Sequence, residues 1–126
     1  MSAPVLRLEA RDVTRGESGW RVRWRVTNVG TDQVRLVAVR APHGRFRSEP
    51  VDLNTVVAES ATVEQTVRVE AAPGEDVENA FVIFVAVKGR ETWRVLFRVR
   101  VHVGADGTPA PVVEAASAHR VGFSEV

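Results

Sequence analysis

Arginine is the residue type in this chain whose spacing most clearly suggests a chemical role. Two rows of arginines alternate with apolar residues: Arg21, Arg23 and Arg25, and Arg94, Arg98 and Arg100. Residues two positions apart on a strand project from the same face, so each set would form a row of guanidinium groups. A guanidinium binds carboxylate or phosphate through two parallel hydrogen bonds. Each row therefore predicts a surface for an acidic partner.

Two interpretations of the first row remain open. Residues 20–50 are rich in arginine and residues 51–79 in Asp and Glu, although the net charge is only +1. If the strand with the first row pairs with the first and fifth strands, Glu9, Glu64 and Glu70 would form ion pairs across the strands. Otherwise the row is free to bind a partner. A charge near zero does not indicate a nucleic-acid protein, and we do not expect nucleic acid as the partner.

The residues needed for catalysis or for metal binding are missing or scattered. The chain has no cysteine, which excludes disulfides, thiol catalysis and cysteine-based zinc sites. His43, His102 and His119 lie far apart in sequence and lack the spacing of a metal site. No G-x-S-x-G motif is present. We therefore expect no enzyme activity, no catalytic residue, no cofactor and no metal.

The elements that would position the arginines are β-strands. Alternating apolar and polar residues predict strands at 6–11, 20–27, 34–39, 45–47, 63–70, 80–87 and 93–102, separated by turns rich in Gly, Pro, Asn and Asp. Residues 51–60 have no clear pattern. No helical periodicity interrupts the strands. The sequence thus predicts an all-β fold, an immunoglobulin-like antiparallel β-sandwich of about seven strands with a C-terminal appendage.

The composition changes at Gly104. We expect residues 1–103 to form the sandwich domain and residues 104–126 to be a linker and C-terminal tail. Residues 112–119 have weak periodicity that fits two helical turns, a frayed tail or a segment swapped between chains. These three alternatives stay open.

The predicted strand 80–87 is apolar on both faces, so something should cover each side. Val82 and Phe84 share one of these faces. We expect it to be covered either by the tail, through residues such as Phe123, or by a second protein chain. Val82, Phe84 and Phe123 are therefore candidate interaction residues.

The segment from Trp20 to Leu36, WRVRWRVTNVGTDQVRL, resembles a strand–turn–strand unit of bacterial immunoglobulin-like domains. Families with this unit include a cell-adhesion-related bacterial domain, a water-stress domain and an intracellular proteinase-inhibitor family. The resemblance covers about one sixth of the chain and implies the sandwich fold without catalysis.

Together these patterns favour a non-catalytic module for protein interaction or assembly, with another protein or a second copy as its partner. The alternative is a module that binds a carbohydrate or nucleic acid through exposed Trp and Arg. Trp20, Trp24 and Trp93 have the parity of core residues, which argues against it. No membrane-spanning run or signal peptide is encoded, so we expect a cytoplasmic protein, although a removed leader would leave the same sequence.

Overall fold

The computed structural model describes residues 2–122 and consists of β-strands joined by turns. The strands are β1 (Leu6–Arg15), β2 (Trp20–Asn28), β3 (Val34–His43), β4 (Phe46–Val57), β5 (Ser60–Val69), β6 (Asp76–Lys88), β7 (Glu91–Val103) and β8 (Pro109–Val121). Among the described residues there is no helix with the length and apolar character needed to span a membrane. The prediction of an all-β chain is confirmed.

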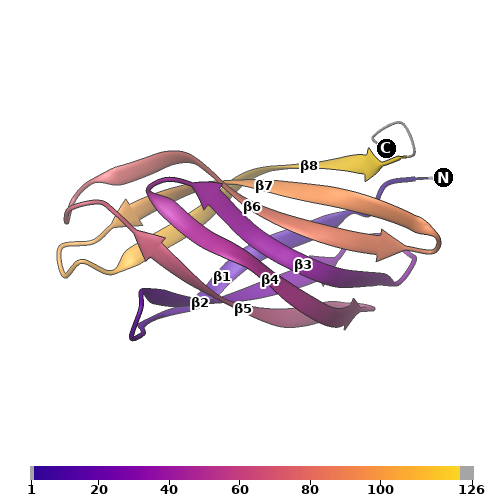
Figure 1. The fold of residues 1–126 in the computed structure, drawn as a ribbon, viewed down its shortest axis with the longest axis horizontal. Coiled ribbons are helices and arrows are strands. Elements are labelled where there is room, and N and C mark those ends of the chain that lie inside the picture. Colours follow the sequence, from indigo (N-terminus) through magenta and orange to yellow (C-terminus); the bar gives the residue numbers. More distant parts are fainter. Residues whose placement is uncertain (1, 123–126) are drawn as a thin grey trace.

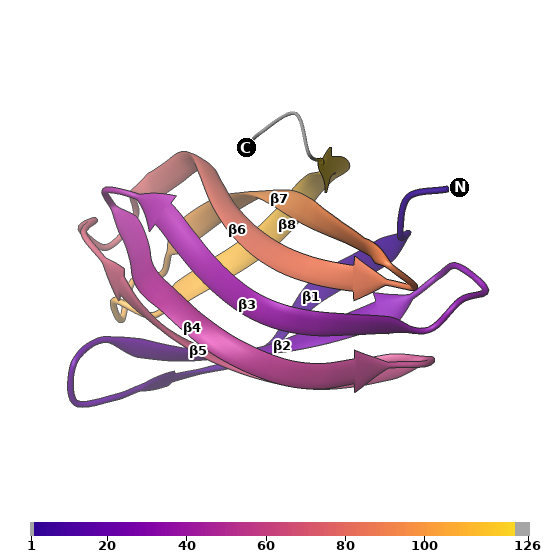
Figure 2. The ribbon, with the colours of Figure 1, turned by 45° about the vertical axis from the view of Figure 1, so that its right-hand side comes forward.

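All strand pairs are antiparallel, in the order β1-β2-β5-β4-β3-β6-β7-β8. The sheet curls until β1 and β2 lie across from β6 and β7 (Figure 1, Figure 2). β1 and β8, the two ends of this order, lie near each other, so the sheet forms a nearly closed barrel. This differs from the prediction of about seven strands in two separate layers. Residues 2–122 contain eight strands, and β4, which pairs with both β5 and β3, links the layers.

The eighth strand corrects the expectation for the C-terminal segment. Residues 112–119 lie within β8, which pairs with β7; the first pair of the register is Thr92 with Val121 and the last is Val103 with Pro109. The two helical turns considered for residues 112–119 are therefore wrong. The physical reason is the free edge of β7, whose backbone groups need partners. The β-branched residues Val112 and Val113 also suit a strand.

β4 is much longer than the short edge strand that the sequence predicted at 45–47. It contains Pro50, which has no amide hydrogen to donate. The register with β3 shifts between the pairs Val39–Val51 and Ala41–Ser48, so β4 has one more residue than β3 at this point. Proline is tolerated at such a bulge, which explains how the strand continues through it.

The interior is filled by the inward residues of every strand. Alternation is clearest in β2 and β7, where each second side chain is buried. The largest fully buried side chains are Trp24, Phe46, Phe84 and Phe97. Phe84 and Phe97 pack edge to face, with ring centroids 6.0 Å apart and planes at 85°, an arrangement that aromatic rings prefer.

Gly19, at the start of β2, is required by its surroundings. Its φ is +155°, and a Cβ at this position would overlap the backbone carbonyl oxygen of Val67 on β5. We expect Gly19→Ala to lower the free energy of unfolding by about 2 kcal/mol or more, because β2 and β5 must separate to admit the methyl group. Urea unfolding followed by tryptophan fluorescence measures this change.

Gly44→Ala is the matched control for this prediction. A Cβ on Gly44 would have no neighbour within 4 Å, so this variant should stay within about 0.5 kcal/mol of the parent. Equal losses in the two variants would contradict the close approach of β2 and β5 at Gly19.

Candidate functional site

A groove lies where β4 and β5 separate. Its volume is about 670 Å³, and it is lined by Ser18, Arg21, Arg47, Ser48, Glu49, Val51, Glu64, Thr66 and Arg68. Within residues 2–122 the register of β4 with β5 contains only the pairs Phe46–Val69 and Arg47–Arg68. Beyond these pairs the sheet opens. We call this site the arginine groove, after Arg21, Arg47 and Arg68.

The strand registers explain why three arginines meet here. Arg21 on β2 lies opposite Thr66 on β5. Arg68 is two residues beyond Thr66 and therefore projects from the same face. Arg47 on β4 lies directly opposite Arg68. Three neighbouring strands thus each contribute one guanidinium group to the same outer surface.

The three groove arginines carry charges that their neighbours do not balance. No ion pair or side-chain hydrogen bond found within the described residues involves Arg21, Arg47 or Arg68. Arg47 and Arg68 form a like-charged pair on adjacent strands, an arrangement that destabilises a sheet. An anion placed between them would remove this repulsion. The groove is therefore suited to bind a negatively charged group.

Two acidic residues, Glu49 and Glu64, also line the groove, and Glu64 interacts with an arginine outside it. Arg23 is 3.1 Å from an oxygen of Asp12 and 3.7 Å from an oxygen of Glu64. Glu64 therefore neutralises Arg23, as one interpretation of the sequence expected. Arg25 is exposed one step further along β2 and lines a separate hollow with Arg23 and Ser60. Within the first row, Arg23 is thus paired with acidic residues, whereas Arg21 faces the groove.

A buried polar network lies beneath the groove and fixes the positions of its strands. The indole Nε1 of Trp24 donates a hydrogen bond to Oε1 of Gln65 at 3.0 Å. Nε2 of Gln65 in turn donates to Oγ of Ser48 at 2.7 Å. This chain connects β2, β5 and β4 inside the molecule. Buried networks of this kind restrict motion when every member is satisfied.

The second row of arginines already has interaction partners within the chain. Arg98 is 4.0 Å from Glu114, and Arg100 is 3.4 Å from Glu114 and 3.5 Å from Asp76. Arg94, on the same face, also has an interaction partner. β8 supplies Glu114, which the sequence had assigned to a tail. Arg94, Arg98 and Arg100 are thus less suited to bind an outside partner than the groove arginines.

Asp76 predicts a measurable pH dependence. The pKa of its carboxyl group lies below the ordinary value of 3.8, first because of the hydrogen bond with His102 Nδ1 at 2.6 Å and also because of the nearby Arg100. A lowered folded-state pKa gives stability that is fully present above pH 3.8 and is lost as pH falls through the folded value. We expect Asp76→Asn to unfold with a weaker pH dependence below 3.8, measured by urea unfolding at a series of pH values.

Asp52→Asn is the control, because Asp52 is exposed and takes part in no ion pair found among residues 2–122. It should keep the pH dependence of the parent. If Asp76→Asn also kept that dependence, the interaction between Asp76 and His102 would have no effect on stability.

Val82 and Phe84, which we expected the tail or a second protein chain to cover, are fully buried in the interior. The opposite face of β6, with Phe81, Val85 and Val87, is turned outward and half-buried. The sequence could not assign the two faces because both are apolar. Phe123 lies outside the described residues.

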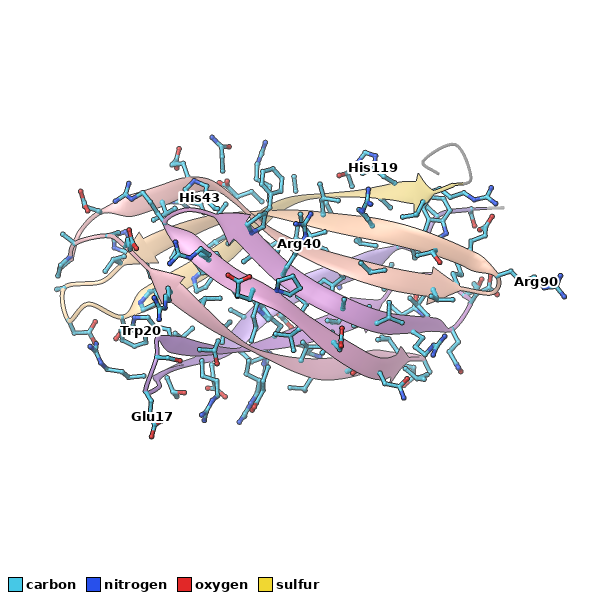
Figure 3. All side chains as sticks on the ribbon, viewed as in Figure 1. Glu17, Trp20, Arg40, His43, Arg90 and His119 are labelled. Carbon is cyan, nitrogen blue, oxygen red and sulfur yellow. The ribbon has the colours of Figure 1, made fainter. Side chains whose placement is uncertain are left out.

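Two of the three tryptophans are buried and are not available to a ligand. Trp24 is completely buried, and Trp93 is 8% exposed. Trp20 is half-buried near the β1–β2 turn that carries Glu17 (Figure 3). The guanidinium carbon of Arg15 lies 5.3 Å from the centre of its ring. That face of Trp20 is therefore already occupied by a cation.

The histidines lie on different parts of the molecule. Figure 3 shows His43 at the end of β3 and His119 on β8, well apart from one another. His102 contacts Asp76 on the outer face of β7. Within residues 2–122 no group of three or more His, Cys, Asp or Glu side chains is arranged to hold a metal ion.

Arg47 and Arg68 are the site residues that sequence reasoning missed. The sequence placed Arg68 only within the predicted strand 63–70, and Arg47 only at the end of the predicted strand 45–47. The contact between them depends on the register between β4 and β5, which joins positions 21 residues apart. Arginines at alternate positions indicate the polar face of a strand, but they do not show which other strand lies beside that strand.

Comparison of the chain with family models, with curated proteins and with solved structures gives no match. The geometry of the arginine groove is therefore the basis for a functional assignment.

Proposed function

We propose that this protein is a non-catalytic interaction module that binds an acidic segment of a partner protein in the arginine groove. The observation that carries the proposal is the like-charged pair of Arg47 and Arg68, with Arg21 beside it and no carboxylate of the described residues within ion-pair distance of the three. Carboxylates of a partner would supply the missing charge through hydrogen bonds to the guanidinium groups.

An acidic protein segment fits the groove better than a nucleic acid does. Glu49 and Glu64 also line the groove, and they would repel a continuous phosphate backbone. Trp24 and Trp93 are buried, so they offer no stacking surface for unpaired bases. A protein segment can place its acidic residues between the arginines and a neutral or basic residue next to the glutamates.

The strand order supports a finer description of the fold. The first, second and fifth strands are neighbours, and so are the third, sixth and seventh. This is the grouping of an immunoglobulin-like sandwich, here linked by β4 and extended by β8. Such sandwiches serve many unrelated functions, so the fold itself does not identify the partner.

The test is the affinity for fluorescent acidic peptides, measured by fluorescence anisotropy at low and at high salt. The protein variant carries Arg21→Gln, Arg47→Gln and Arg68→Gln. We expect the parent to bind glutamate-containing peptides and the variant to bind at least about tenfold more weakly. Binding by the parent should also weaken as salt is added, because the contacts are exposed charges.

The matched control replaces three exposed arginines that do not line the groove, with Arg35→Gln, Arg40→Gln and Arg90→Gln. Arg40 and Arg90 are labelled in Figure 3. This control has the same net charge as the groove variant and should keep the parent affinity within about twofold. Equal losses would show a general charge effect and would overturn the proposal. So would a single-stranded oligonucleotide that binds more tightly than every peptide and depends on the same three arginines.

A further inference from the structure

The arginine groove lies beside a strand edge that has no partner. β5 pairs with β2 from Trp20–Val67 to Thr27–Ser60. Its pairing with β4 covers only Phe46–Val69 and Arg47–Arg68 within residues 2–122. β4 then continues along β3 as far as Val34–Val57. The edge of β5 that faces β4 is therefore unpaired between Ser60 and Val67.

An unpaired edge can bind an extended peptide as an additional strand, through backbone hydrogen bonds. Neighbouring strands lie about 4.8 Å apart, and side chains on one face recur about every 6.8 Å. A strand added beside β5 would continue the line that β4 leaves after Arg47. Its outward residue opposite Thr66 would lie in line with Arg47 and diagonal to Arg68. Arg21 would be two strands away, on the other side of Thr66.

We infer that the partner segment binds in extended form as a strand on the free edge of β5, with an acidic residue opposite Thr66. This inference rests on the proposed function and adds the mode of recognition. Arg68 on β5 and Arg47 on β4 are the nearest guanidinium groups to that position, and Arg21 lies beyond Thr66 on β2.

The neighbouring positions of the added strand have requirements of their own. The next outward position lies opposite Glu64, where an acidic side chain would be repelled, so we expect a neutral or basic residue. The position between them faces inward beside Gln65, whose amide donates to Ser48. A small side chain such as Ala or Ser fits there. The segment is thus an alternating sequence of acidic, small, and neutral or basic residues, and not a run of acids.

Peptides with modified backbones test the inference on the intact protein. The probe is a fluorescent peptide of ten residues with one central Glu, Ala on either side of it and Thr or Lys two positions away. Two derivatives carry N-methyl groups on alternate amides, one set on the even and one on the odd positions. Only one set of amides in an added strand points toward β5. We expect one derivative to bind at least about tenfold more weakly and the other to keep its affinity within about threefold.

Amide hydrogen exchange gives a second measurement. Binding of the unmodified peptide should slow exchange at alternate amides of residues 61–67 by at least about tenfold. Amides of β8, which pairs with β7 and has a second free edge, serve as the internal control and should not change.

The outcomes separate the inference from the proposed function. If the peptide binds through the three arginines but both N-methylated derivatives bind equally well, the strand addition is overturned and the acidic-partner function stands. Unchanged exchange in β5 on binding would have the same meaning. If neither this peptide nor any other acidic peptide binds the parent more tightly than the groove variant, both are overturned.

Discussion

A chain that ends at Val103 should lose its cooperative unfolding transition. It lacks β8, which pairs with β7 along nearly its whole length. It also lacks Arg120, which lies 3.4 Å from the carboxylate of Glu91, a side chain that is only 7% exposed. Removal of β8 leaves the backbone groups along the edge of β7 and the carboxylate of Glu91 without their partners, and a domain of this size has only about 5–15 kcal/mol of stability. Far-UV circular dichroism during heating measures the transition.

A chain that ends at Gly122 is the matched control, because it keeps β8 and removes only residues 123–126. It should unfold like the full chain. If the chain ending at Val103 instead unfolded at the same temperature as both longer chains, β8 would contribute nothing to the fold. That result would support the expectation that residues 1–103 form a complete domain.

The sequence predicted the strands in which apolar and polar residues alternate clearly. It failed where this alternation does not show whether a segment is a strand or which of its faces is buried. β2 begins at Trp20 as predicted, because one of its faces is apolar and the other is charged. β6 is apolar on both faces, so its inward face could not be chosen from the pattern. β8 has small residues near its middle, including Ala115 and Ala116, and its existence follows from the free edge of β7. That cause is tertiary and does not appear in the local sequence.

The candidate site could be predicted only in part, for a related reason. The row containing Arg21 and Arg23 is visible in the sequence, but the two residues have different surroundings. Arg23 meets Asp12 and Glu64, whereas Arg21 faces the groove. A shift of two residues in the register of β2 with β5 would place Arg21, instead of Arg23, opposite Glu64 and would leave both arginines on the outer face. The sequence thus shows that a row of arginines is charged. Whether acidic residues neutralise the row depends on which strand lies beside it.

Trp24→Ala should be the most destabilising single substitution considered for this chain, with a loss of roughly 3–5 kcal/mol in the free energy of unfolding. Trp24 is completely buried, so removal of its side chain leaves a large cavity. The change also leaves Oε1 of Gln65 without the indole hydrogen bond of 3.0 Å, and an unsatisfied buried polar atom has a further cost. Urea unfolding followed by circular dichroism measures the loss without relying on tryptophan fluorescence.

Trp20→Ala provides the control in the same strand. Trp20 is half-buried and contacts Arg15 through its ring, so its replacement should cost only about 1 kcal/mol.

The two variants should also differ in peptide binding. Because Gln65 also donates to Ser48, Trp24→Ala should loosen β4 against β5 and weaken peptide binding at the arginine groove under conditions where the protein is still folded. If peptide affinity did not change in the folded Trp24→Ala variant, the network would stabilise the core without positioning the groove.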